Sequence, residues 1–201
     1  MTVDTHPLRC RCGALQGQIA LGGPTSRMVC YCKDCQAFAR YLGPAERVLD
    51  AQGGSDVVQL APHRIRITRG QEHLAVMRLS SKGMLRWYAA CCRTPVGNTM
   101  TSRNMPFTGL LVQCLDSAPV DVAFGPVMAT ANAQSALGEP KPRAFGLPSA
   151  LLRILRIVAG SRLSGKYKAN PFFTAAGDPV ALPTVLAPDE RARLDAVSAT
   201  A

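Results

Sequence analysis

Short segments with alternating or continuous apolar positions run through the first 125 residues. Residues 64–68 alternate polar and apolar side chains, which is the period-two pattern of a half-buried strand. Residues 74–79 and 84–88 are further candidate strands, and residues 109–115 are apolar enough to predict a buried strand. Turn-forming residues such as the Gly-Gly-Pro of 22–24 separate these segments. The pattern predicts a mainly β fold in this part of the chain.

Three other segments carry the signals of helices. The first begins at Cys35 and stops at the Gly-Pro pair of 43–44. The second covers residues 149–160, starting at a serine that can cap a helix and ending at a glycine. The third opens around Pro188, with acidic residues beside it that suit a first helical turn.

The 149–160 segment is apolar except for a narrow stripe formed by Ser149, Arg153 and Arg156. Such a helix is buried on most sides, pairs with another chain or lies on a membrane surface. Packing in the core or in a homodimer is the commoner arrangement, and we expect one of these two.

The composition changes near residue 126. Alanine and serine become frequent beyond this point, cysteine disappears and prolines interrupt the chain at 140, 142 and 148. We therefore predict two regions, a β domain at 8–125 and an Ala/Pro-rich, basic helical extension at 126–201.

Bulk composition narrows the class of protein. The 201 residues are 47% hydrophobic and 18% charged, which is enough apolar material for a core. There is no run of about 18 apolar residues that could form a transmembrane helix. The first seven residues also lack the apolar stretch of a secretory signal, so we expect a cytoplasmic protein.

The chain is basic, with 23 Lys and Arg against 13 Asp and Glu. Residues 139–170 hold seven basic side chains and one acidic one. This charge favours anionic partners such as a carboxylate-bearing metabolite or a phosphate. Nucleic acid and acidic membrane are less favoured partners, and aromatic residues for stacking on bases make up only 5% of the chain.

Cysteine spacing is the most informative feature of the sequence. In a reducing compartment, clustered cysteines usually bind metal or carry out chemistry. Two cysteines one residue apart in an extended segment point the same way, so each C-x-C pair offers two thiolates to one ion. Zinc is the expected ion, because it accepts soft thiolates in tetrahedral geometry. Seven of the eight cysteines are clustered, at Cys10 and Cys12, at Cys30, Cys32 and Cys35, and at Cys91 and Cys92.

The cluster of Cys30, Cys32 and Cys35 supplies three ligands within six residues and leaves a fourth position open, as in catalytic zinc sites. Alternatively, Asp34, His63 or His73 fills the fourth position and closes a second structural site.

Cys10 and Cys12 need two further ligands, and Cys91 and Cys92 are the remaining pair. This predicts a second zinc, in a closed four-cysteine structural site. An iron–sulfur cluster is an alternative, although it usually has other spacings.

Three segments together resemble a known family. They read CRCGALQG from Cys10, CYCKDC from Cys30 and CRTP from Cys92. They are similar to the motifs C-x-C-G, C-x-C-x-x-C and C-x-x-C-G-T-P of the glutathione-dependent formaldehyde-activating enzyme and centromere protein V family. The resemblance covers residues 8–125 and implies zinc-stabilised antiparallel sheets in a β-tent-like fold. It also implies a structural four-cysteine zinc and a three-cysteine zinc open to thiol substrates.

The sequence departs from this family at its last motif. Ala89 stands where the family has the first cysteine, and Arg93 stands where it has a glycine. Cys91 must then provide the fourth ligand by a different backbone path, or water must.

Two functions follow as hypotheses. The first is a carbon–sulfur lyase-like enzyme acting on adducts of glutathione or another small thiol, with Cys30, Cys32 and Cys35 at its catalytic zinc. The alternative is a non-catalytic zinc-stabilised binding module that uses the basic segment 139–170. Redox sensing through Cys91 and Cys92 ranks third, because adjacent cysteines rarely form stable disulfides.

Overall fold

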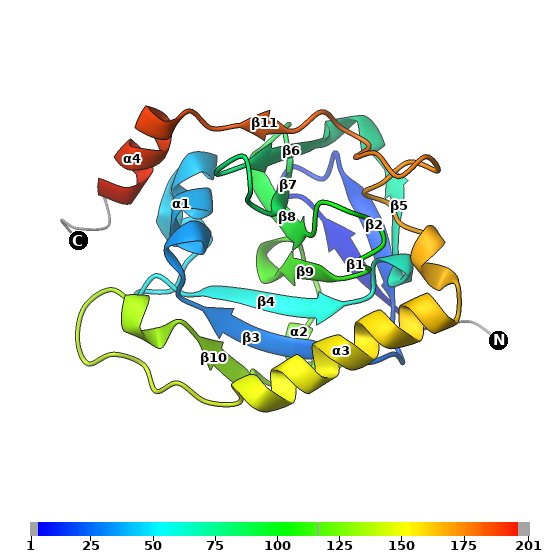
Figure 1. The fold of residues 1–201 in the computed structure, drawn as a ribbon, viewed down its shortest axis with the longest axis horizontal. Coiled ribbons are helices and arrows are strands. Elements are labelled where there is room, and N and C mark those ends of the chain that lie inside the picture. The colour runs from blue at the N-terminus through cyan, green and yellow to red at the C-terminus, as the bar shows by residue number, and fades with distance from the viewer. Residues whose placement is uncertain (1–3, 116, 197–201) are drawn as a thin grey trace.

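Two β-sheets organise the chain in the computed structural model, which describes residues 4–115 and 117–196 (Figure 1). One sheet has three antiparallel strands in the order β1-β2-β5, and the other has eight strands in the order β10-β3-β4-β9-β8-β7-β6-β11. The strands are β1 Thr5–Arg9, β2 Gln16–Ala20, β3 Ser26–Cys30, β4 Ser55–Leu60, β5 Ile65–Arg69, β6 Leu74–Arg78, β7 Leu85–Ala89, β8 Thr94–Thr99, β9 Thr108–Leu111, β10 Ala129–Ala131 and β11 Thr184–Val185. The helices are α1 Lys33–Leu42, α2 Val120–Phe124, α3 Leu147–Leu163 and α4 Pro188–Ala196.

The predicted mainly β fold is confirmed, and the segments predicted at 64–68, 74–79 and 84–88 are strands β5, β6 and β7. The strand predicted over 109–115 is too long, because β9 ends at Leu111 and the chain turns into a 3-10 helix over Val112–Cys114. An apolar run that is buried on all sides has no periodicity to distinguish a strand from a turn.

Residues beyond 126 contribute to the same sheet as the first part of the chain. Strand β10 pairs with β3 and β11 pairs with β6, both in parallel, so the large sheet is mixed rather than purely antiparallel. Phe172 is fully buried, and its ring centroid lies 5.0 Å from that of Trp87. The two regions predicted from composition therefore share one sheet and one core.

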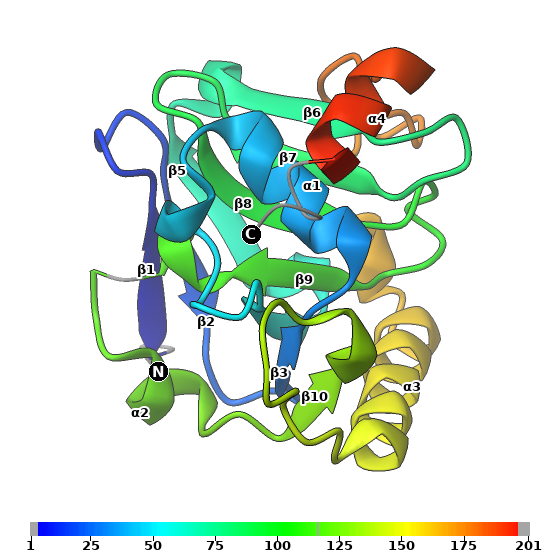
Figure 2. The ribbon, with the colours of Figure 1, turned by 90° about the vertical axis from the view of Figure 1, so that its left-hand side faces the viewer.

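Helix α1 packs on the large sheet, and α4 lies beside α1 (Figure 2). The buried face of α1 includes Phe38 and Leu42, which pack in one cluster with Met77 and Leu111 of the sheet. The helix begins at Lys33, two residues before the predicted start, because Cys32 caps it: the Cys32 Sγ accepts a hydrogen bond from the Cys35 N–H at 3.3 Å.

Helix α3 lies across the outside of β3, β4 and β10 (Figure 1). It extends beyond the predicted 149–160 at both ends and buries only Ala150, Ile157 and Ser161. It is therefore not buried on most sides within the chain. The leucines on its outer face are exposed: Leu147, Leu151, Leu152, Leu155 and Leu163. Within residues 4–115 and 117–196, no helix combines the length and the apolar character needed to cross a membrane.

Candidate metal centres

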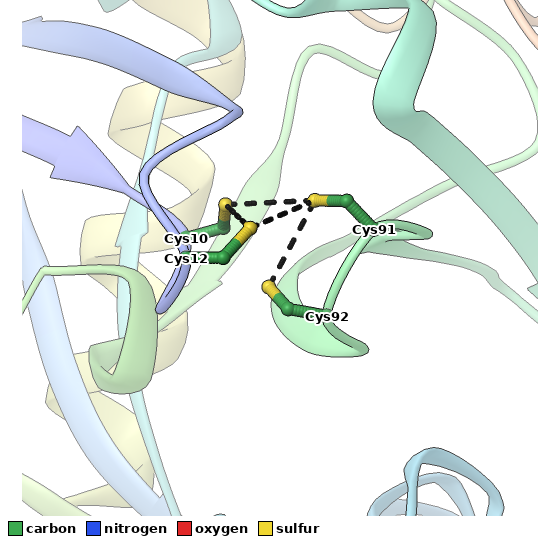
Figure 3. Close-up of side chains that lie close together, drawn as sticks. All are labelled: Cys10, Cys12, Cys91 and Cys92. Carbon is green, nitrogen blue, oxygen red and sulfur yellow. Dashed lines mark hydrogen bonds between the residues drawn. The ribbon is translucent and has the colours of Figure 1, made fainter.

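Four cysteines from two distant turns meet in one cluster (Figure 3). Cys10 and Cys12 lie in the turn between β1 and β2, and Cys91 and Cys92 lie in the turn between β7 and β8. The Sγ–Sγ distances are 3.5 Å for Cys10–Cys12, 3.4 Å for Cys12–Cys91 and 3.7 Å for Cys10–Cys91. All four sulfurs lie within 4.8 Å of one another, so the four cysteines could hold a metal ion.

The backbone of the β7–β8 turn explains why Cys91, rather than residue 89, joins this cluster. Ala89 ends β7 and is fully buried in the core. Arg93 adopts a left-handed φ of 57°, and its N–H donates to the Ala89 carbonyl at 2.7 Å. This tight turn brings both Cys91 and Cys92 to Cys10 and Cys12.

Polar contacts hold the two turns together beside the sulfurs. The Arg11 N–H donates to Thr94 Oγ1 at 3.0 Å, and Thr94 Oγ1 lies 3.1 Å from Cys92 Sγ. Burial opposes ionisation of Cys92, but hydrogen bonds from Thr94 and Cys12 outweigh it and lower the Cys92 pKa to about 6. Desolvation and the neighbouring thiols raise the pKa of Cys91. The pKa values of the two adjacent thiols therefore shift in opposite directions.

The second cluster is formed where β3 leads into α1. Cys30 is the last residue of β3, Cys32 caps α1 and Cys35 lies in the first turn of that helix. The three sulfurs lie within 4.8 Å of one another, with 3.1 Å between Cys32 and Cys35. Cys30 and Cys32 keep part of their surface exposed, whereas the thiol of Cys35 is largely buried. The predicted grouping of Cys30, Cys32 and Cys35 is therefore present.

Asn132 also contacts this cluster, and the sequence contained no signal for it. Its Nδ2 donates to Cys30 Sγ at 3.4 Å from a left-handed position directly after β10. The contact depends on the parallel pairing of β10 with β3, which places Ala131 opposite Cys30.

The three thiols share their charge unequally. Hydrogen bonds from Cys32 and Cys35 lower the pKa of Cys30 to about 2, and a further bond from Asn132 acts in the same direction. The hydrogen bonds that Cys35 makes with Cys30 and Cys32, together with burial, raise the pKa of Cys35. The three sulfurs therefore interact strongly with one another, as expected for side chains this close together.

Among the described residues, no fourth His, Cys, Asp or Glu joins this cluster. The Asp34 carboxylate instead pairs with Arg191 at 2.8 Å and Arg86 at 3.5 Å. His63 lies 3.2 Å from the Ser161 hydroxyl, and His73 pairs with the neighbouring Glu72. Asp34, His63 and His73 thus interact with other side chains and not with the three cysteines.

A cavity of about 300 Å³ lies against the start of α1. Lys33 and Gln36, which flank Cys35 in α1, line its wall. Its other lining residues are Gln134, Ser135, Ala136, Leu137 and Asp195. None of the three cysteines lines this cavity.

Both clusters could hold a metal ion, since their donors are thiol sulfurs in sets of four and three. The four-cysteine set is complete for a tetrahedral ion. The three-cysteine set leaves one tetrahedral position without a protein ligand among the described residues.

Comparison with known proteins supplies a family but no function. No curated protein matches the chain. A crystal structure of a Rhodobacter sphaeroides protein, a structural-genomics target, is 20% identical, covers 63% of this chain and 99% of its own, and has a TM-score of 0.42. A likeness at this level supports no functional assignment. A family of unknown function, DUF6151, matches residues 2–183, and the chain belongs to this family.

Proposed function

We propose that both clusters bind zinc and that the chain is a carbon–sulfur lyase-like enzyme acting on an adduct of a small thiol such as glutathione. The four-cysteine zinc is structural in this proposal, and the three-cysteine zinc faces the substrate. The observation that carries the proposal is the convergence of three cysteine sulfurs without a fourth protein ligand among the described residues. The resemblance of the cysteine motifs to the formaldehyde-activating enzyme family points to the same chemistry.

The surrounding residues suit an anionic thiol. Zinc held by three thiolates supplies a Lewis acid with one position for an external sulfur or oxygen. The positive end of the ten-residue helix α1 lies at Cys32 and Cys35 and favours negative charge there. Lys33 is the first residue of α1 and is exposed, so it can pair with a carboxylate of the substrate. Asn132 holds Cys30 in position through its hydrogen bond.

Zinc K-edge X-ray absorption tests this function directly. Addition of glutathione to the two-zinc protein should raise the average number of sulfur ligands per zinc, because one new sulfur enters the open position. The same sample should convert S-hydroxymethylglutathione, and Cys35→Ser should lose both effects. Cys114→Ala, which removes a thiol outside both clusters, is the matched control and should keep them. If glutathione leaves the average number of sulfur ligands per zinc unchanged and no turnover is seen, the proposed enzymatic function is refuted.

A second candidate function, binding to an anionic membrane surface, has its own observation. The outer face of α3 exposes Leu147, Leu151 and Leu155 beside basic side chains. There is no Asp or Glu between Glu139 and Asp178. The basic residues in this interval are Lys141, Arg143, Arg153, Arg156, Arg162, Lys166 and Lys168. An exposed apolar stripe flanked by cations fits an anionic lipid surface better than nucleic acid, for which few aromatic residues are present.

Vesicle cosedimentation tests this candidate. The protein should sediment with vesicles containing phosphatidylserine and not with pure phosphatidylcholine vesicles. The double variant Leu151→Ser, Leu155→Ser should lose this binding, whereas Val122→Ser, which changes an exposed apolar residue on α2, should keep it. Salt-sensitive retention on heparin without vesicle binding would favour nucleic acid. A concentration-dependent dimer that the double variant abolishes would favour the predicted homodimer.

A further inference from the structure

A cavity of about 510 Å³ lies between the end of α1 and the β7–β8 turn. Three arginines line it: Arg11 from the β1–β2 turn, Arg47 from the 3-10 turn after α1, and Arg93 from the β7–β8 turn. No Asp or Glu lines this cavity. Its size falls within the usual range for small-molecule sites.

None of these arginines has a carboxylate partner among the described residues. This distinguishes them from Arg27, whose charge is neutralised by Asp56 at 2.6 Å. Three unpaired guanidiniums around one cavity repel one another, and an anion that contacts them relieves this repulsion.

Two of the three guanidiniums are already positioned by the fold. Arg11 Nη2 donates to the Cys92 carbonyl at 2.9 Å. The Arg93 guanidinium lies over the Tyr41 ring, 5.1 Å from its centroid. Arg47 has no such contact and is free to close on a ligand, since its side chain takes part in no hydrogen bond or ring contact in the described structure. A site with two fixed cations and one adaptable cation needs little reorganisation to bind.

The rest of the cavity wall is largely apolar. A bare inorganic ion is therefore not the ligand that fits this cavity best. Leu42, Pro44, Val48 and Pro95 contribute apolar surface, and Thr94 and Gln113 contribute polar groups. Such a wall suits a ligand with a carbon skeleton between its charged groups.

We propose that this cavity is a binding site for a small organic anion that carries two or more negative charges, either a polycarboxylate or an organic phosphate. Arginine recognises both groups through paired N–H donors. The site is independent of the proposed enzyme, because Cys30, Cys32 and Cys35 do not line it. Two of its arginines are instead carried by the turns of the four-cysteine cluster.

Isothermal titration calorimetry on the metal-loaded full chain tests the site with two probes, citrate for polycarboxylates and glycerol 3-phosphate for organic phosphates. Sodium chloride at matched ionic strength controls for screening. At least one probe should give saturable binding to one site per chain. Arg47→Gln should weaken that binding by about tenfold or more, because it removes a charged hydrogen-bond partner away from the cysteines.

The matched control is Arg66→Gln, which removes one exposed positive charge on β5, outside the cavity lining. It should change affinity by less than about twofold. The proposal is overturned if neither probe binds above the chloride control. It is also overturned if binding survives Arg47→Gln unchanged, or if both variants weaken it equally, since general surface charge would then be responsible.

Discussion

The Sγ atoms of Cys12 and Cys91 lie 3.4 Å apart, although 79 positions separate the two residues in the chain. Cys12 belongs to the turn of the three-stranded sheet, and Cys91 belongs to a turn of the eight-stranded sheet. An ion bound by this cluster would therefore tie the two sheets together. The cluster of Cys30, Cys32 and Cys35 closes only a short local loop by comparison.

Cys12→Ser should strongly destabilise the fold. Structural zinc contributes on the order of 10 kcal/mol to folding, and a site that joins distant turns closes a long loop in the unfolded chain. We expect poorly folded or insoluble protein, measured by thermal unfolding together with zinc content. A wild-type melting temperature in Cys12→Ser would contradict a structural role for this cluster.

Cys91→Ser should be as damaging as Cys92→Ser, because the sulfurs of both residues belong to the four-cysteine group. Ala89→Cys should add no zinc affinity, since position 89 is buried in the core and Cys91 already completes the set. The extra sulfur is expected to cost about 1 kcal/mol through overpacking. Zinc affinity by chelator competition checks all three variants. Full zinc retention in Cys91→Ser would show that another ligand, such as water, closes the site.

Cys35→Ser should remain folded and lose about one of two zinc ions, in contrast to Cys12→Ser. The three ligands lie within six residues, so an ion there adds little to global stability. Circular dichroism and zinc content on the same sample measure the two effects. If Cys35→Ser loses the fold, the three-cysteine cluster also has a structural role, which contradicts the proposed separation between a structural cluster and a substrate-facing cluster.

Asn132→Gly should lower zinc affinity at the three-cysteine cluster by about tenfold, the lower end of the effects seen when a hydrogen bond to a metal ligand is lost. Glycine tolerates the left-handed backbone at this position, so the substitution removes the amide without straining the turn. Competition with a chromophoric chelator measures the affinity. The four-cysteine cluster is the internal control, and equal weakening of both sites would indicate general destabilisation.

Phe172→Ala should cost about 3–5 kcal/mol of unfolding free energy, because this ring is fully buried against Trp87. Denaturant unfolding measures the loss. Leu163→Ala, at a side chain that is 89% exposed, is the control and should change stability by less than about 0.5 kcal/mol. A small effect of Phe172→Ala would mean that the C-terminal region is dispensable for the core.

Local spacing alone determined the three-cysteine cluster and some of the strands. Cys30, Cys32 and Cys35 meet because the strand repeat and the first helical turn act over only a few residues. The periodic segments that became β5, β6 and β7 were predictable for the same reason. The pairing of Cys10 and Cys12 with Cys91 and Cys92 followed only by elimination among the remaining cysteines.

Tertiary structure decided the features that depend on contacts between distant segments. Strands β10 and β11 have three and two residues, too few to show a pattern, and only their pairing with β3 and β6 defines them. Asn132 reaches Cys30 through one of these pairings. The arginine cavity likewise assembles from three turns. Residue spacing encodes local geometry, whereas the free energy of these contacts depends on which surfaces the folded sheets bring together.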